Sequence, residues 1–310
     1  METLVDVFLA LLLIAMGGWA VVAREARSAV IIFIIYGLLL SLVWVRIAAV
    51  DVALTEAAIG SGVTGMLLIT AAARLRPAVR TAFVPGLPFR VIAGVFCAAI
   101  AGGIAVLPLY AGPPASLAAQ AVDNLASSGL GNPVAGVLFV YRAFDTLLEK
   151  VVLLLALLGV WSLAPDKFWG GIPGLKVIAE RDSALVFLAR TLPPVGIMFA
   201  IYMTWVGADG PGGAFQGGTV LAAMWILVMM AGLWPVPPIQ SRPLRIMLLA
   251  GPAIFLVIGL AGFVLADAFL AYPSGFAKLL IIVVEFALTL SIGVALGLLA
   301  AGPPERAPPT

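Results

Sequence analysis

Four ionisable residues fall within nine positions in the middle of an otherwise apolar stretch of the sequence. They are Arg142, Asp145, Glu149 and Lys150, and apolar runs stand on both sides of them. A single charge at the centre of a helix that crosses a bilayer costs about 2.5–3.5 kcal/mol. At 100° per residue, Arg142, Asp145 and Glu149 share one helix face, and Lys150 points somewhat aside. We expect this face to contact protein or water, where its acids and its lysine can hold and pass protons.

Two interpretations of this charged cluster stay open. In the first, the charges neutralise one another and keep neighbouring helices in register, since a charge left alone in this place is very costly. In the second, Asp145 pairs with Arg142, and Glu149 and Lys150 are protonation sites near the middle of the membrane. One structural pair needs only two of the four groups, so the excess of charge favours the second interpretation.

Three further acids lie in apolar stretches. Asp51 begins the third of these stretches, and Glu56 lies more than a turn deeper, among alanines and glycines that allow close helix contacts. Glu285 has no charge near it in the sequence, so it requires a partner from another helix. Glu56 and Glu285 are each either a structural group or a relay site, whereas Asp51 is expected at the outer end of its helix, near the lipid headgroups, in a supporting role. We expect Glu56, Glu149 and Glu285 to line one lateral polar path.

Residues 207–218 are rich in glycine and connect two apolar stretches. Glycines permit unusual backbone angles and close helix approach, and can form a re-entrant turn. The stretch is no phosphate cradle, because no lysine follows it and no strand precedes it. We expect its glycines to serve packing, with Asp209 and Gln216 as candidates for lining a polar entry.

The composition is that of an integral membrane protein. The chain has 310 residues, of which 63% are hydrophobic and only 10% charged. It has no histidine and a single cysteine, Cys97, which argues against haem ligation, thiolate or histidine metal sites, and imidazole relays. A net charge of +2 without a basic run gives no reason to expect nucleic acid as a partner. We therefore expect no cofactor, no metal site and no enzymatic activity, because no nucleophile stands beside a base.

The predicted fold is all-α, a bundle of about nine transmembrane helices, because each crossing needs ~20 apolar residues. Nearly all lysines and arginines fall in alternate loops and in the C-terminal tail, and the other loops hold only Arg46 and Lys278, both at helix ends. The positive-inside rule then places the N-terminus outside and the C-terminus in the cytoplasm. The nine stretches are 4–23, 29–46, 51–73, 91–111, 133–162, 184–206, 215–234, 245–266 and 277–300.

The same reasoning divides the chain into four parts. Residues 1–80 contain three predicted helices, residues 81–165 two, and residues 166–300 four. The tail 301–310 is rich in proline, and we expect it to be disordered.

Three stretches resemble subunits of known membrane complexes. Residues 51–68 (DVALTEAAIGSGVTGMLL) resemble MbhD, a small subunit of membrane-bound hydrogenases. Residues 140–154 (VYRAFDTLLEKVVLL) are similar to MbhE of the same complexes, where F-R-G-F-D-T-x-G-E is usual. Residues 207–223 (GADGPGGAFQGGTVLAA) resemble MnhB of multisubunit Na+/H+ antiporters of the Mrp/Mnh type, where R-G-H-N-x-P-G-G-G-F-x-G-G is usual. The three segments follow one another in the order MbhD, MbhE, MnhB and cover most of the chain.

The resemblance carries over some site residues and not others. Glu56, Asp145 and Glu149 match buried acids of the family, whereas Lys150 and Glu285 have no counterpart in its motifs. The chain departs from the usual patterns at Ala143, Leu148 and Lys150 in the second stretch. It also departs at Val206, directly before the third stretch, and at Ala208, Asp209 and Ala214 within it.

The resemblance implies an accessory subunit of a cation/proton antiporter complex that contributes buried carboxylates to an ion or proton path. Its implied partners are complex-I-like large proton-translocating subunits, small membrane subunits, Na+ and H+. The implied location is the cell membrane, namely a bacterial inner membrane. Two alternatives stay open: a membrane-arm subunit of a complex-I-like hydrogenase, and a purely structural assembly subunit.

Overall fold

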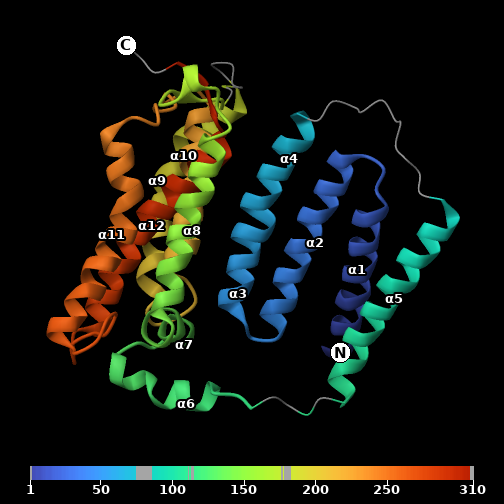
Figure 1. The fold of residues 1–310 in the computed structure, drawn as a ribbon, viewed down its shortest axis with the longest axis horizontal. Helices are drawn as coiled ribbons and strands as arrows, with labels where there is room; N and C mark the ends of the chain where they lie inside the picture. The colour runs from blue at the N-terminus through green and yellow to red at the C-terminus, as the bar shows by residue number, and fades with distance from the viewer. Residues whose placement is uncertain are drawn as a thin grey trace.

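The helices form two groups that lie side by side, joined by a long connection across one end of the molecule (Figure 1). The computed structural model describes residues 2–74, 86–110, 115–175 and 183–307, together with Gly112 and Val177. The first group contains α1 (Glu2–Val22), α2 (Ala26–Arg46), the continuous run of α3 (Val50–Thr55), π-helical η1 (Glu56–Val63) and α4 (Thr64–Arg74), and α5 (Leu87–Tyr110).

The connection and the second group complete the described chain. The connection contains α6 (Ala118–Asp123) and the 3₁₀ helix η2 (Leu125–Ser128). The second group contains α7 (Pro133–Gly136), π-helical η3 (Val137–Tyr141), α8 (Ala143–Trp161), the 3₁₀ helix η4 (Asp166–Phe168), α9 (Ala184–Val206), α10 (Ala214–Met230), α11 (Arg242–Leu265) and α12 (Ala277–Ala301). Apart from two very short strands in the described residues, the fold is helical, which confirms the predicted all-α bundle.

A helical segment occupies each of the nine predicted stretches, because a backbone in lipid must satisfy its own hydrogen bonds. Within the described ranges, seven helices are long and apolar enough to cross a membrane. The apolar helix α10 is shorter, with 17 residues, and the run from α7 to α8 carries the central charges. The chain is a multi-pass membrane protein. Nine crossings with the N-terminus outside stay a prediction.

Residues 133–162 do not form the single regular helix that the apolar run predicts. After the π-helical turn η3, the backbone leaves helical geometry at Arg142, with φ −131° and ψ 36°. The hydroxyl group of Thr146 bridges this break by donating to the carbonyl oxygen of Leu138 at 2.6 Å. The break changes the helical phase between η3 and α8, so a constant 100° per residue does not relate the faces of these two segments.

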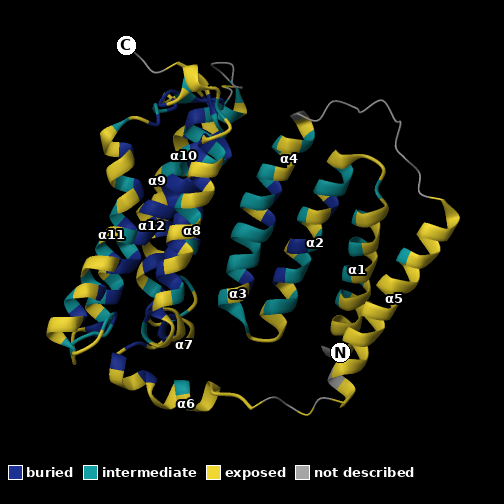
Figure 2. Ribbon diagram, viewed as in Figure 1, coloured by how far each residue is buried: buried dark blue, intermediate teal, exposed yellow. Residues whose placement is uncertain are grey.

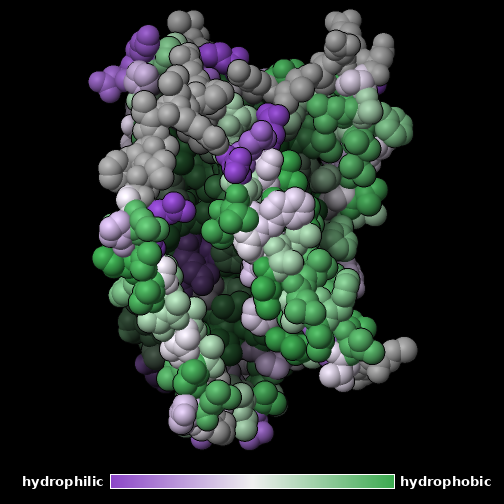
Figure 3. Space-filling view, turned by 90° about the vertical axis from the view of Figure 1, so that its right-hand side faces the viewer, coloured by the Kyte–Doolittle hydropathy of each residue, from purple (hydrophilic) through white to green (hydrophobic). Residues whose placement is uncertain are grey.

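The core of the second group surrounds α12, which packs against α8, α9, α10 and α11. Its residues Ile281, Val284 and Leu288 are fully buried, and Figure 2 shows α12 as largely buried. In contrast, α1 and α5 expose apolar side chains along their lengths. Figure 3 shows one face of the molecule as mostly hydrophobic, with hydrophilic residues mainly toward its ends and in a recess. Such surfaces suit lipid or the helices of other subunits.

The C-terminal tail is more ordered than its proline content predicts. Strand β2 (Pro304–Arg306) pairs antiparallel with strand β1 (Ile172–Pro173), which lies between α8 and α9. The strand pairing gives the backbone of the tail hydrogen-bond partners that the tail cannot supply by itself. Pro304 is fully buried. The expected disorder is therefore wrong for residues 304–306, and residues 308–310 lie outside the described part of the chain.

Candidate functional site

A cavity of about 390 Å³ lies where the two helix groups meet. One wall comes from α3 and η1 of the first group, and the others come from the run α7 to α8, the loop before α10, α10 itself and α12. Five of the nine site residues predicted from the sequence come together here. The polar lining residues are Asp51, Thr55, Asn132, Thr146, Glu149, Lys150, Gln216 and Glu285.

Lys150 is deeply buried at this cavity, with 3% of its side chain exposed. Its Nζ atom lies 3.7 Å from Oε2 of Glu149 and 3.5 Å from the centre of the Phe215 ring. Lys150 points aside from the face of Asp145 and Glu149, as the sequence predicts, and it is Lys150 that faces the protein interior. The buried face of α8 includes Ala143, Thr146 and Lys150, whereas Glu149 at its edge is half exposed. The ammonium group is thus held between a carboxylate and an aromatic face, an arrangement that stabilises a desolvated cation.

Glu285 approaches the same cavity from α12. Its side chain is 2% exposed, and its Oε2 atom has no hydrogen-bond partner among the described residues. The backbone N–H of Ala214 donates to its carboxyl group, and Lys150 and Asp51 lie close enough to interact with it electrostatically. The sequence required a partner from another helix for this acid, and α8 and α3 provide the neighbouring charges.

Two hydrogen bonds cross from the first helix group to the second at the cavity. Oδ1 of Asp51 accepts from the backbone N–H of Gly212 at 3.0 Å, and Nε2 of Gln216 donates to the Thr55 hydroxyl oxygen at 3.0 Å. Both acceptors lie one turn apart on α3, which directs them to the same side. These bonds place the N-terminal group against the beginning of α10 and close the cavity on that side.

Gly213 shapes the cavity because its backbone has a φ of 124°, a region that side chains rarely adopt. A β-carbon at this position would also lie 3.0 Å from Oε1 of Glu285. The glycine therefore allows α10 to begin directly beside the carboxyl group. The expected packing role of the glycines agrees with this close approach.

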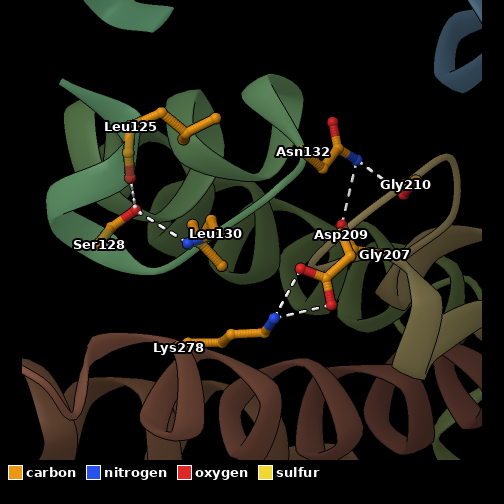
Figure 4. Close-up of polar contacts among 8 residues, drawn as sticks. All are labelled: Leu125, Ser128, Leu130, Asn132, Gly207, Asp209, Gly210 and Lys278. Carbon is orange, nitrogen blue, oxygen red and sulfur yellow. Dashed lines mark hydrogen bonds and ion pairs between the residues drawn. The ribbon is translucent and has the colours of Figure 1, made fainter. Parts of the chain in front are cut away.

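The loop between α9 and α10 is held by the segment that precedes α7 (Figure 4). The backbone N–H groups of Gly131 and Asn132 both donate to the carbonyl oxygen of Ala208, at 3.0 and 3.1 Å. The side-chain amide of Asn132 donates to the carbonyl oxygens of Gly207 and Gly210, at 3.1 and 2.9 Å. Asn132 also lines the cavity, so it fixes the cavity wall and the loop together.

Asp209 lies on the outside of this loop and does not line the cavity. Both of its carboxylate oxygens contact Nζ of Lys278 at the beginning of α12, at 2.6 and 2.7 Å, as Figure 4 shows. About half of the Asp209 side chain is exposed. The pair thus ties the loop to α12.

Three other predicted site residues lie outside the cavity. Asp145 pairs with Arg142, as expected, and both side chains are largely exposed. The carboxyl group of Glu56 lies instead at the contact with α2, where a β-carbon on Gly37 would approach its Oε1 atom to 3.1 Å. The glycines and alanines around Glu56 thus allow the close helix contact that the sequence predicts. Glu56 does not share the cavity with Glu149.

Sequence reasoning missed three contributors to the cavity. Asn132 followed by a proline is typical of a helix start, and the structure does use it as an N-cap, but nothing in that signal predicts its bonds to a loop about 75 residues away. Thr55 and Phe215 stand next to residues that were selected, yet their types carry no specific signal. Only the fold reveals that they contact Gln216 and Lys150.

Comparisons with known protein families find two matching regions. The MbhD family of membrane-bound hydrogenase (MBH) subunits matches residues 11–77, and the domain related to the MnhB subunit of Na+/H+ antiporter matches residues 184–301. Their order along the chain is the predicted one. No individually curated protein matches the sequence. The resemblance of residues 140–154 to MbhE stays a prediction.

Two solved structures resemble the whole fold or most of it. A chain in the structure of the Mrp complex from Dietzia sp. DQ12-45-1b has a TM-score of 0.73 and 25% identity, over 98% of this chain and 35% of that one. This protein thus spans about a third of the Mrp chain that it matches. A chain of the membrane-bound sulfane sulfur reductase, an archaeal respiratory membrane complex, has a TM-score of 0.55 and 21% identity, over 69% of this chain and 98% of that one.

The two matched regions lie on opposite sides of the cavity. The matched regions contribute α3 on one side and α10 and α12 on the other. The chain therefore carries an MbhD-like segment in front of a domain related to the MnhB subunit, and its fold resembles a chain of the Mrp complex.

Proposed function

We propose that the chain is an accessory subunit of a multisubunit Na+/H+ antiporter complex and that its cavity is a segment of an ion or proton path. One observation carries this proposal: the buried Lys150 ammonium lies at a cavity that Glu149 and Glu285 also line. Ionisable groups inside a membrane protein are expensive and mark ion and proton pathways. A protonated lysine beside two carboxyl groups can give its proton to one of them and is then reprotonated by the other.

The roles within the path follow from exposure. Half-exposed Glu149 is the entry group, Lys150 is the carrier, and fully buried Glu285 is the inner group. Asp51 and Gln216 support the path by holding the cavity closed. Glu56 lies one residue beyond Thr55 and serves as a relay group outside the cavity. In this proposal Asp145, Arg142 and Asp209 have structural roles.

We infer that the partners are large complex-I-like proton-translocating subunits and small membrane subunits. The inference is supported by the likeness to a chain of the Mrp complex, of which this chain covers 35%. The proposed location is a bacterial inner membrane, with the C-terminus in the cytoplasm. The proposed parts are residues 1–80, 81–165, 166–300 and the tail 301–310.

The proposal is tested by comparing Glu285→Gln and Glu149→Gln with Glu25→Gln, a control at an exposed loop residue. The complex would be expressed with each variant, and inside-out vesicles would be loaded with a pH-sensitive dye. Addition of Na+, K+ or Li+ should collapse the proton gradient. We expect both cavity variants to slow this exchange at least about tenfold, a change of about 1.4 kcal/mol in the barrier. Normal exchange in an assembled Glu285→Gln complex would refute the proposed path.

A second candidate is a membrane-arm subunit of a redox-driven complex such as a hydrogenase. The match of residues 11–77 to the MbhD family of hydrogenase subunits favours it, as does the fold shared with a sulfane sulfur reductase complex. Mass spectrometry of the subunits that co-purify with the chain separates the two candidates. Nickel–iron or iron–sulfur subunits in the purified complex would replace the antiporter assignment.

The third candidate, a purely structural subunit, predicts a different result from the same variants. In that case Glu149→Gln and Glu285→Gln would alter assembly on native gels and the melting temperature, while any complex that assembles would exchange ions at the normal rate. Loss of exchange in a complex of normal composition and stability contradicts this candidate.

A further inference from the structure

A second hollow lies at the opposite end of α8 from the cavity, close to the strands β1 and β2. It is a groove of about 420 Å³ between the end of α8 and the beginning of α11. Leucines of both helices form most of its wall, and the buried Leu157 and Leu248 belong to the hydrophobic core beneath it. Trp161, Trp169, Ile239 and Arg245 complete the lining. The groove is therefore apolar along its length and carries a few polar atoms.

Trp161 lines this groove and carries a hydrogen-bond donor that has no partner among the described residues. Its side chain is 6% exposed, and its indole N–H is buried without a hydrogen-bond partner among the described residues. A buried donor without an acceptor is unfavourable, and native proteins rarely leave one unpaired. A ligand with an acceptor oxygen in the groove would satisfy it.

Arg245 supplies a positive charge at the same place. Its Nε–H donates to the carbonyl oxygen of Ile239 at 3.0 Å, which fixes the guanidinium group at the groove. Among the described residues it has no acidic partner. It lies in the first turns of α11, a helix of 24 residues, whose N-terminus also favours negative charge. Charge complementarity thus points to an anionic group beside an apolar chain.

We propose that this groove binds an anionic phospholipid. The acyl chain lies along the leucines, an ester or glycerol oxygen accepts from Trp161, and the phosphate group contacts Arg245 at the beginning of α11. The groove lies at the end of the bundle that the positive-inside rule places in the cytoplasm. Anionic lipids gather in the cytoplasmic leaflet, and basic pockets between helices on this side bind their head groups. Tryptophans are also typical of this depth.

The test uses the assembled complex, purified through this chain and reconstituted in phosphatidylcholine vesicles with a minor fraction of phosphatidylglycerol. Native mass spectrometry counts the retained phosphatidylglycerol, and acyl-brominated phosphatidylglycerol reports proximity by quenching tryptophan fluorescence. The variants are Arg245→Gln, which removes the charge, and Trp161→Phe, which removes the donor and keeps a ring. Arg190→Gln is the matched control, because Arg190 is an exposed arginine on α9 that does not line the groove.

We expect the unaltered complex and Arg190→Gln to retain phosphatidylglycerol equally, Arg245→Gln to retain it at least tenfold less, and Trp161→Phe several-fold less. Because Trp161→Phe preserves packing, it keeps the test valid if Arg245→Gln fails to assemble. Three results would overturn the proposal: equal retention in all variants, displacement of the lipid by inorganic phosphate alone, or crosslinks showing that another subunit fills the groove. The binding readouts do not depend on ion exchange.

Discussion

Replacing Lys150 with methionine separates a role in the ion path from a role in stability. Methionine has a similar length and keeps contact with the Phe215 ring through favourable sulfur–aromatic interactions. It removes only the ammonium group and its charge.

The effect on stability follows from the surroundings of the ammonium group. At 3.7 Å its attraction to Glu149 is about 4 kcal/mol at an effective dielectric constant of ~20 and about 1 kcal/mol in bulk water. Since Glu149 is half exposed, solvent screening brings the value toward the lower figure. The contact with the Phe215 ring adds about 2 kcal/mol. Burying the ammonium costs several kcal/mol, so the two sides nearly cancel.

We therefore expect Lys150→Met to leave the melting temperature of the complex within roughly 4 °C of the original. Cation-driven proton exchange in inside-out vesicles should nevertheless fall at least about tenfold, since the carrier between two carboxyl groups is gone. Leu148→Met, at an exposed apolar position of the same helix, should change neither quantity. Undiminished exchange in a folded Lys150→Met complex would refute the reasoning. A melting temperature that collapses together with exchange would instead assign Lys150 to structure.

Three further predictions concern the loop that closes the cavity. Gly213→Ala should destabilise the complex by about 1–3 kcal/mol and slow exchange, because the new β-carbon meets both an unfavourable φ and the Glu285 carboxyl group. Asn132→Ala should lower stability by about 2–3 kcal/mol, since two loop carbonyl groups lose their donor. Asp209→Lys should lower the stability of the complex by roughly 0.5–1 kcal/mol at low salt, a small loss because the ion pair is partly exposed. Adding Lys278→Asp to the same chain should restore the stability, because the pair then forms with its charges exchanged.

Thermal unfolding of the purified complex, followed by tryptophan fluorescence, measures all three changes. Gly159→Ala is the control for the glycine, since an added β-carbon there meets nothing within 4 Å inside a helix. Ser127→Ala controls for the asparagine, because Ser127 bonds only locally among the described residues. The Asp209→Lys and Asp209→Lys/Lys278→Asp variants are also unfolded at high salt, where screening should shrink the difference between their melting temperatures. Equal melting temperatures for Gly213→Ala and Gly159→Ala would contradict the strained contact at the cavity.

The helices were predictable from the sequence because long apolar runs admit almost no other structure in lipid. The pairing of Asp145 with Arg142 was also predictable, since the two are three residues apart and interact within one turn. Glu285 has no charged residue near it in the sequence, which correctly indicated that its charged neighbours come from other helices.

The buried face of α8 was not predictable by the same means. Within α8 the directions follow the regular 100° per residue, and Ala143, Thr146 and Lys150 share the buried face. The spacing alone could not say which face of α8 packs against α10 and α12, because that depends on the fold. The pairing of Asp209 with Lys278 was equally hidden, because 69 residues separate them and only the fold brings α12 beside the loop. The short strand of the tail depends in the same way on a distant partner.

The two hydrogen bonds between α3 and the beginning of α10 have a consequence for the evolution of such proteins. Two separate polypeptides need a tight interface to stay together at low concentration in a membrane. When one chain carries both helix groups, each encounters the other at a high local concentration, and modest bonds such as that between Gln216 and Thr55 suffice. Gene fusion thus fixes a one-to-one ratio of the two parts. It also frees the residues around the cavity to change without loss of the partner.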